Sequence, residues 1–130
     1  MQNKVLYAWC AGIIDGEGSI FLEKAKIRKQ HRPSVTVANT DYRIILKLKE
    51  VLGGGILLTK RRDRPNHLPC WTWYSKGRSV ASVLEKVTPF LVSKKEKAEV
   101  ILPFAKTVGK KPIDDDYRSR LVGKFNKIIL

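Results

Sequence analysis

Near its N-terminus the chain reads Cys10-Ala11-Gly12-Ile13-Ile14-Asp15-Gly16-Glu17-Gly18-Ser19, a stretch that gathers small residues, two acids and three glycines. Apolar residues recur with helical spacing up to this point, which predicts a helix over residues 4–15. Gly16 should end that helix, because glycine readily takes the left-handed conformation found at helix C-termini. A strand is expected to follow over residues 19–28. The stretch therefore marks where a helix passes into a sheet.

One face of the predicted helix carries almost no bulky side chain. The positions i, i+3, i+4 and i+7 that share this face are Ala8, Ala11, Gly12 and Asp15. Two such helices can approach closely, so we predict that these residues form a contact between two copies of the chain. If the helices cross near their C-terminal ends, the two copies of Glu17 lie side by side. Paired carboxylates at a basic surface suit divalent cations that bind through oxygen.

A plainer interpretation of the same stretch is a helix that ends at a glycine, with both acids only solvated, and the pattern alone leaves this open. An EF-hand calcium loop is a third interpretation, since Asp15 and Glu17 stand two residues apart as ligands of that loop do. It is excluded because Ile20 occupies the position where the loop needs glycine.

The remainder of the chain alternates helices with pairs of strands. Pro33 predicts a turn after the first strand, and Thr40 or Asp41 can cap the second helix. The expected elements are strands over residues 34–39, 56–62 and 70–75, and helices over residues 41–52, 79–87, 94–108 and 114–127. This order predicts a single α+β domain over residues 1–130, with an antiparallel sheet whose helices cover one face and leave the other free.

Composition narrows the class of protein. The chain has 130 residues with 43% apolar content, enough for one core, and 26 Lys and Arg against 12 Asp and Glu give a net charge of +14. The basic residues fall in three separate clusters, which favours a broad basic surface for a polyanion over a charged tail. A merely soluble lysine-rich surface is the alternative.

Other classes are not favoured by the sequence. Cys10 and Cys70 stand far apart without partners at zinc-site spacing, so neither a disulfide framework nor a zinc site is indicated. The acids at residues 114–116 are better explained as caps of the last helix than as a metal cluster. No segment is long enough to span a membrane, and no cleavage site follows the apolar residues 5–14. We expect an intracellular protein, in a prokaryotic cytoplasm or an organelle matrix, and not a secreted one.

The ten residues from Cys10 resemble the motif of the LAGLIDADG homing endonucleases, with Cys for the first Leu, Ile for the second, and Gly16-Glu17 for the Ala-Asp pair. The order α-β-β-α-β-β-α also resembles the fold of that family. The resemblance implies an enzyme that cuts both strands of duplex DNA at a specific site, using Mg²⁺ or another divalent cation such as Mn²⁺. It also implies sheets that form a saddle in the major groove, cleavage that leaves short 3′ overhangs, and a gene inside an intron or intein. One copy of the motif implies a homodimer and a nearly palindromic target.

The resemblance also implies roles for individual residues. Glu17 would bind the metal and act in catalysis, and Gly16 would add its backbone carbonyl. The family has a polar residue at the end of the second strand that orients water, and Asp41 matches it, although Asp41 is equally suited to cap a helix. Lys94 follows a Pro-Phe-Leu segment at residues 89–91 as the catalytic Lys of the family does, and it can stabilise charge on the phosphate. A plain position on a helix surface is its alternative role.

Alternation along the strands predicts the side chains that read bases. On the outward face we expect Ser19, Phe21, Glu23, Ser34, Thr36, Ala38, Lys60, Arg62, Thr72 and Tyr74, with Lys60 and Arg62 pointing the same way as Ile56 and Leu58. Trp71 and Trp73 should pack inward. The basic residues Lys24, Lys26 and Arg28 have the opposite parity in the first strand. Either they reach phosphates at the rim, or a bulge near Leu22 turns them to the groove, and we favour the bulge.

The resemblance leaves a second function open, because some members of the family assist the folding of their own intron, and the basic composition leaves a third. A maturase that binds intron RNA would use the same fold without needing a catalytic acid, so Glu17 and Lys94 argue against RNA binding as the sole function. A small ribosomal or chromatin protein without activity is a third hypothesis. Cleavage of DNA in the presence of magnesium separates the first function from both.

Overall fold

The computed structural model describes residues 2–24, 31–59 and 68–128. The elements run in this order: α1 (Gln2–Glu17), β1 (Gly18–Lys24), β2 (His31–Asn39), α2 (Tyr42–Leu52), β3 (Gly55–Thr59), β4 (Cys70–Lys76), α3 (Ser79–Val87), the 3-10 helix η1 (Thr88–Phe90), α4 (Lys95–Thr107) and α5 (Asp115–Asn126). The predicted α-β-β-α-β-β-α order, followed by two more helices, is confirmed. In the described part of the chain no helix is long and apolar enough to cross a membrane.

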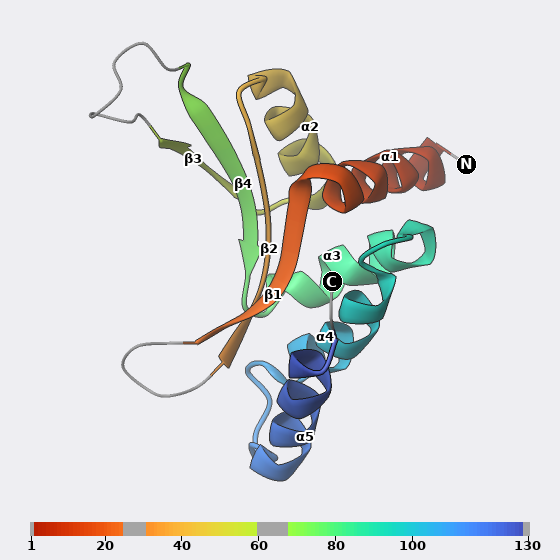
Figure 1. The fold of residues 1–130 in the computed structure, drawn as a ribbon, viewed down its shortest axis with the longest axis vertical. Coiled ribbons are helices and arrows are strands. Elements are labelled where there is room, and N and C mark those ends of the chain that lie inside the picture. Colours follow the sequence, from red (N-terminus) through yellow and green to blue (C-terminus); the bar gives the residue numbers. More distant parts are fainter. Residues whose placement is uncertain (1, 25–30, 60–67, 129–130) are drawn as a thin grey trace.

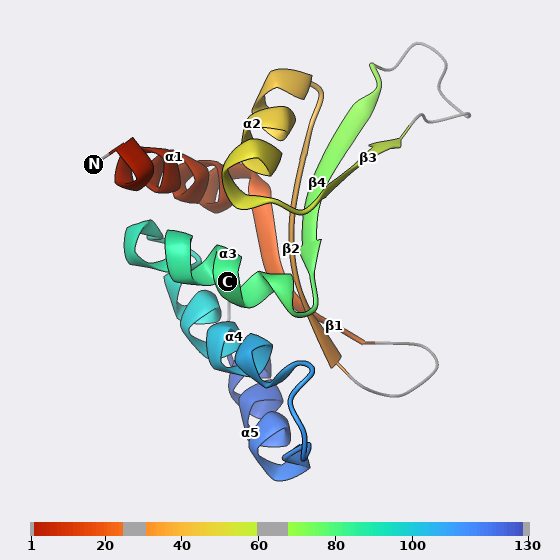
Figure 2. The same cartoon turned by 180° about the vertical axis from the view of Figure 1, so that it is seen from behind.

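The four strands form one antiparallel sheet in the order β1-β2-β4-β3. Figures 1 and 2 show all five α-helices on the same side of it. An antiparallel sheet can expose one face while the other packs on a core, and this sheet does so. The predicted α+β architecture with one free sheet face is therefore confirmed.

The core lies between the sheet and the helices. Val35, Val37 and Trp73 point to it from the sheet, and each is at most 1% exposed. They meet the apolar faces of the helices, whose largest fully buried side chains are Ile14, Ile45, Leu48, Leu84, Ile101 and Phe104. The indole Nε1 of Trp73 donates to the Gly53 carbonyl at 2.7 Å, so its single polar atom is satisfied.

Residues that alternate with these core positions define what we call the open face. They are Ser19, Phe21 and Glu23 of β1, Arg32, Ser34, Thr36 and Ala38 of β2, Gly55, Leu57 and Thr59 of β3, and Cys70, Thr72, Tyr74 and Lys76 of β4. The register places them in rows across the sheet, because directly paired residues of antiparallel strands share a face. Ser19, Thr36, Tyr74 and Gly55 form one such row.

The end of α1 differs from the prediction. The helix does not stop at Gly16 but continues to Glu17, and Gly16 does not have a positive φ angle. The glycine that the junction requires is Gly18, where an added Cβ would lie 3.0 Å from backbone atoms of Ile14 and from the Thr36 carbonyl oxygen. Close packing of the helix end on β2 explains this glycine, and a left-handed helix stop does not.

The first hairpin also corrects two predictions. The pairing of β1 with β2 runs without interruption from Gly18 and Val37 to Lys24 and His31, so the bulge predicted near Leu22 is absent from this part of the strand. Leu22 packs against the core instead. Pro33 lies inside β2 and not in a turn. Its carbonyl accepts from Gly77 N at 2.9 Å, just past the end of β4. The side of Pro33 that lacks an N–H therefore faces β4 at the point where the β2–β4 pairing ends.

The third strand was predicted with the wrong alternation. Ile56 packs against the core, whereas Leu57 lies on the open face with 58% of its surface exposed. Directly paired with Trp73, Ile56 must share the buried side of the sheet. Lys60 and Arg62, whose direction was inferred from Ile56 and Leu58, lie outside the described residues.

Candidate functional site

Glu17 is the last residue of α1 and lies exposed where the helix meets the sheet. Its Oε2 accepts a hydrogen bond from Nδ2 of Asn39, which is the last residue of β2. Asn39 has the parity of Val35 and Val37, so it points to the side of the sheet where the end of α1 lies. The Asn39 amide oxygen accepts from Asp41 N at 2.7 Å, which fixes the orientation of its amide. Asn39 thus orients Glu17 while its own amide is fixed by the backbone of Asp41.

Asn39 is a residue that the sequence analysis missed. The polar residue at the end of the second strand was assigned to Asp41, two positions further along the chain. Asp41 is the N-cap of α2, as the alternative role predicted, and its carboxylate accepts from Arg43 N at 3.0 Å and from the Arg43 guanidinium at 2.9 and 3.0 Å. The Arg43 hydrogen bonds hold the pKa of Asp41 below its usual value. Among the described contacts, Asn39 and not Asp41 touches Glu17.

Lys94 lies beside the end of α1. Its Nζ donates to the backbone carbonyl of Asp15 at 2.6 Å, two residues before Glu17. The segment that carries Lys94 is fixed to the same residue, because the Asp15 carboxylate accepts from Val92 N at 2.7 Å, Ser93 Oγ at 3.2 Å and Lys94 N at 3.1 Å. Asp15 therefore joins two segments that are 77 to 79 residues apart in the chain.

Replacing Asp15 with Ala should reduce the free energy of unfolding by about 1–3 kcal/mol, because two backbone N–H groups and a hydroxyl lose their acceptor. Asp114→Ala is the matched control, since Asp114 caps α5 through a single bond to Tyr117 N and its loss should cost about 1 kcal/mol. Urea unfolding of both variants measures the difference. Equal losses would show that Asp15 is no more than an ordinary cap.

The exposed face of α1 is rotated about the helix axis relative to the prediction, so that it carries only part of the predicted residues. Ala11 is fully buried in the core of the chain, so the prediction that its side chain contacts a second copy is wrong. Asp15 is turned toward Val92 and Lys94 by the bonds described above. Ala8 and Gly12 are exposed as predicted, and Gly16 continues the line one turn further on. An added Cβ at Gly12 or Gly16 would meet no atom within 4 Å.

The open face carries some of the side chains that were predicted to read bases. Thr36, Ala38, Thr72 and Tyr74 alternate with core residues as predicted, and Trp73 is buried on the other side. Trp71 also packs against the core, with its ring centroid 5.2 Å from the ring centroid of Tyr42. On β1, Ser19, Phe21 and Glu23 lie on the open face, and Ser19 is exposed.

Besides Lys60 and Arg62, four predicted base-reading positions need correction or lie outside the described residues. Ser34 has the right parity but is 0% exposed, because its short side chain lies between the longer Phe21 and Lys76 that pair with it. Lys24 is exposed but has the helix-side parity of Ile20 and Leu22. Lys26 and Arg28 lie outside the described residues. The open face also presents Arg32, Leu57 and Lys76, which the analysis of the sequence did not name.

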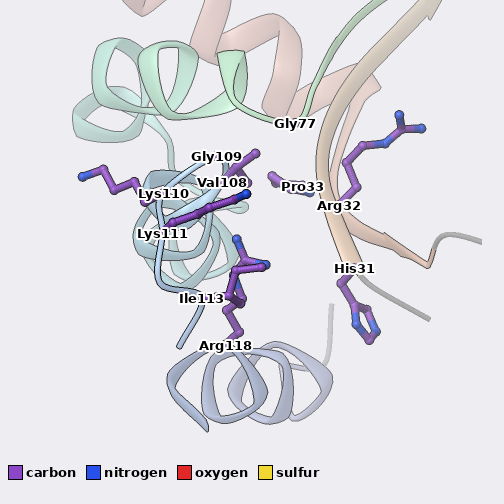
Figure 3. Close-up of a pocket in the computed structure, with 10 residues that line it drawn as sticks. All are labelled: His31, Arg32, Pro33, Gly77, Val108, Gly109, Lys110, Lys111, Ile113 and Arg118. Carbon is purple, nitrogen blue, oxygen red and sulfur yellow. The ribbon is translucent and has the colours of Figure 1, made fainter. Parts of the chain in front are cut away.

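A basic hollow of about 430 Å³ lies at the end of β2 opposite to Asn39. It is lined by residues from β2 and from the segment around the α4–α5 connection, and the basic ones are His31, Arg32, Lys110, Lys111 and Arg118. Arg118 is fixed by bonds to Thr107 at 2.8 and 2.9 Å. Figure 3 shows that Arg32 points away from the other basic side chains, on the opposite side of the strand. The hollow extends positive charge beyond the sheet.

The described residues hold no group of three or more His, Cys, Asp or Glu side chains that could bind a metal alone. Glu17 therefore lacks, among the described residues, the partners that would complete a three-ligand metal site. Cys10 is buried, and burial raises the pKa of its thiol to about 11, so it stays protonated at neutral pH as a core residue. Cys10 and Cys70 are both free, as predicted.

Comparison with known proteins gives a clear relationship. The chain is similar to DNA endonuclease I-CvuI of Chlorella vulgaris, with 31% identity over 112 residues that span 81% of this chain and 66% of the relative. It thus covers about two thirds of the length of that relative. No model of a protein family matches the sequence.

Solved structures share the fold. A crystal structure of the homing endonuclease I-CvuI with its target has a TM-score of 0.74 at 26% identity, covering 97% of this chain and 81% of that chain. The archaeal intron-encoded homing endonuclease I-Vdi141I bound to DNA has a TM-score of 0.69 at 18% identity, over 92% of this chain and 79% of that one. The LAGLIDADG homing endonuclease I-GzeII has a TM-score of 0.64 at 16% identity, with 92% of this chain matching 42% of that one. With the motif from Cys10 and the geometry around Glu17, the relationship to I-CvuI shows that the chain belongs to the LAGLIDADG homing endonuclease family.

Proposed function

We propose that the protein is a homodimeric endonuclease that cuts both strands of duplex DNA at a specific, nearly palindromic target, with a divalent cation held by Glu17. The observation that carries this proposal is the exposed Glu17, held by Asn39 and lying within two residues of the Lys94 contact, where α1 meets the sheet. The similarity to a DNA endonuclease supports the same function.

The open face is suited to the major groove. That groove admits a β-ribbon, and its base edges offer donors, acceptors and thymine methyl groups. Thr36, Thr72 and Tyr74 supply hydroxyl groups, and Leu57 supplies an apolar contact. A net charge of +14 supplies the long-range attraction to phosphates. Base reading by the sheet and phosphate binding around it are therefore compatible on one surface.

The residues around Glu17 fit a magnesium or manganese ion. Glu17 offers a carboxylate, and the carbonyl of Gly16 belongs to the last helical turn, whose carbonyls lack helical partners. When bound, a cation would supply positive charge where the phosphodiester develops negative charge. Asn39 keeps the Glu17 carboxylate oriented, and the second N–H of its Nδ2 would donate to a water molecule. Lys94 contributes a second positive charge for the phosphate, fixed in place through Asp15.

Two copies of the chain would build this site together. Glu17 belongs to no group of three or more metal-binding side chains among the described residues, and a twofold axis beside α1 would bring a second Glu17 next to it. The exposed Ala8, Gly12 and Gly16 allow two such helices to approach, and Val5 and Trp9 beside them are 69% and 37% exposed. In the structural comparison with I-GzeII, this fold occupies less than half of the longer chain. A homodimer of the present chain would supply the other half.

The proposal is tested with purified protein, magnesium and a plasmid library carrying candidate insertion sites. Double-strand cuts at one sequence, absent when the metal is chelated, are expected, and the activity would then lie inside the cell where the target DNA is. Binding to structured RNA without any DNA cleavage would instead favour an intron maturase on the same fold. A protein that neither cuts DNA nor prefers any sequence would contradict the proposal.

A further inference from the structure

The open face carries one acid among its described positions, Glu23. A carboxylate on a surface that meets DNA is repelled by phosphates, so it needs a compensating interaction. Glu23 has two. Its Oε2 lies 3.1 Å from Nη2 of Arg32, its direct partner across the β1–β2 ladder, and 3.4 Å from Nζ of Lys76 on β4. The three side chains form one cluster that spans three strands.

The cluster is accessible from the open face. The side chains of Arg32, Glu23 and Lys76 are 52%, 35% and 34% exposed. Figure 3 shows Arg32 reaching away from the basic hollow on the other side of the strand. A ligand on the open face can therefore touch all three groups.

The atoms that remain available are as informative as the bonded ones. Both cations contact the same oxygen, Oε2, and within the described part of the chain no bond engages the Glu23 Oε1 or the Arg32 Nε and Nη1. The hydrogen bond from Arg32 and the charge of Lys76 hold the pKa of Glu23 below its usual value. The cluster thus offers a fixed ionised acceptor beside a guanidinium fork, because the second N–H of Nη2 still lies next to an N–H of Nε or Nη1.

This pattern is complementary to one base pair. In the major groove, a G·C pair presents the N7 and O6 acceptors of guanine followed by the N4 amino donor of cytosine. Arginine donates to the two guanine acceptors in a bidentate manner, and a glutamate accepts from cytosine N4. An A·T pair presents a donor between two acceptors, which does not match. The order donor, donor, acceptor along Arg32 and Glu23 fits G·C.

We propose that Glu23 and Arg32 together read one G·C base pair in each half-site of the target, with Lys76 holding the carboxylate in place. This inference rests on the proposed function, because it assumes that the open face enters the major groove. It assigns one position of the recognition sequence to a pair of side chains. The twofold symmetry of the dimer repeats that position in the other half-site.

The test selects bound duplexes from a library randomised across both half-sites and compares the base frequencies for the wild type and variants. Wild-type protein should restrict one position in each half-site to G·C. Arg32→Lys keeps the charge but loses the bidentate fork, so the preference at that position should fall by about 5- to 150-fold while other positions keep theirs. Glu23→Gln should weaken the preference at the same position.

Lys24→Ala is the matched control, because Lys24 is exposed on β1 next to Glu23 but has the opposite parity. It should lower affinity for all sequences alike, as loss of a phosphate contact does. If Arg32→Lys and Glu23→Gln change every position alike, or none, this inference is wrong while the proposed function stands. If the wild-type protein enriches no duplex, both fail.

Discussion

Glu17→Gln should lower the rate of DNA cleavage by roughly 10³-fold or more while leaving DNA affinity within a few-fold of the wild type. The variant keeps the size of the side chain and one amide oxygen for the bond from Asn39 Nδ2, so the local structure has little reason to change. It removes the charged oxygen that Glu17 offers to a cation, and the described residues hold no group of three metal-binding side chains that could replace it. Charge stabilisation by a bound cation is worth several kcal/mol, and each 1.36 kcal/mol is tenfold in rate.

Glu99→Gln is the matched control for this experiment. Glu99 is also exposed and helical, but it lies on α4 and takes no part in the Glu17, Asn39 and Lys94 contacts. Single-turnover cleavage and equilibrium binding should be measured on the same target duplex for both variants. Normal cleavage by the Glu17→Gln variant would remove Glu17 from the mechanism. A large loss of binding would instead show that Glu17 acts mainly in holding the protein on DNA.

The sequence predicted the fold well where apolar and polar residues alternate clearly. It predicted less well which face of a strand points to the core where that alternation is absent. The core parity of β2 and β4 followed from Val35, Val37 and Trp73, whose apolar side chains alternate with polar ones. In β3, Ile56, Leu57 and Leu58 are all apolar, so alternation gave no information about which of them faces the core. Only pairing with Trp73 resolves this, and pairing is a tertiary property.

The first hairpin was mispredicted for a related reason. The positive charges at Lys24, Lys26 and Arg28 suggested that the strand must turn them toward the ligand, and a bulge was invoked to do so. The described strand stops at Lys24 with its ladder intact. Burial of Ile20 and Leu22 determines which residues of β1 face the core. Exposed lysine side chains do not change this, because they reach solvent from either face of the sheet.

The candidate site was predicted to different extents. Glu17 and Lys94 were found because each is contiguous with a recognisable segment, and the structure brings both to the end of α1. Their catalytic roles remain predictions. Asn39 was missed because contact between the end of a strand and the end of a helix depends on tertiary packing. Ala11 was misplaced because a small side chain serves equally well in a core or in a helix crossing, so its size does not distinguish the two.

Gly12→Leu is expected to convert the proposed homodimer to monomers at micromolar concentration and to remove cleavage with it. Within the protomer the change is tolerated, since a Cβ at Gly12 meets no atom within 4 Å and Leu favours helix over Gly by about 0.8–1 kcal/mol. Any disruption must therefore come from the second copy. Overpacking costs about 1–3 kcal/mol for each intruding side chain, and a twofold interface receives two. The dissociation constant of the dimer should rise by roughly 30-fold or more.

Gly123→Leu separates this effect from a general consequence of placing leucine in a helix. Gly123 lies in α5, and an added Cβ there also meets no atom within 4 Å, so both variants make the same change in a similar local setting. Sedimentation equilibrium should show monomers for the Gly12→Leu variant and dimers for the Gly123→Leu variant, with both folded by circular dichroism. A Gly12→Leu variant that sediments as the wild-type dimer would move the interface away from the exposed face of α1. Glu17 would then have no symmetry mate beside it, and the shared metal site proposed for cleavage would be lost.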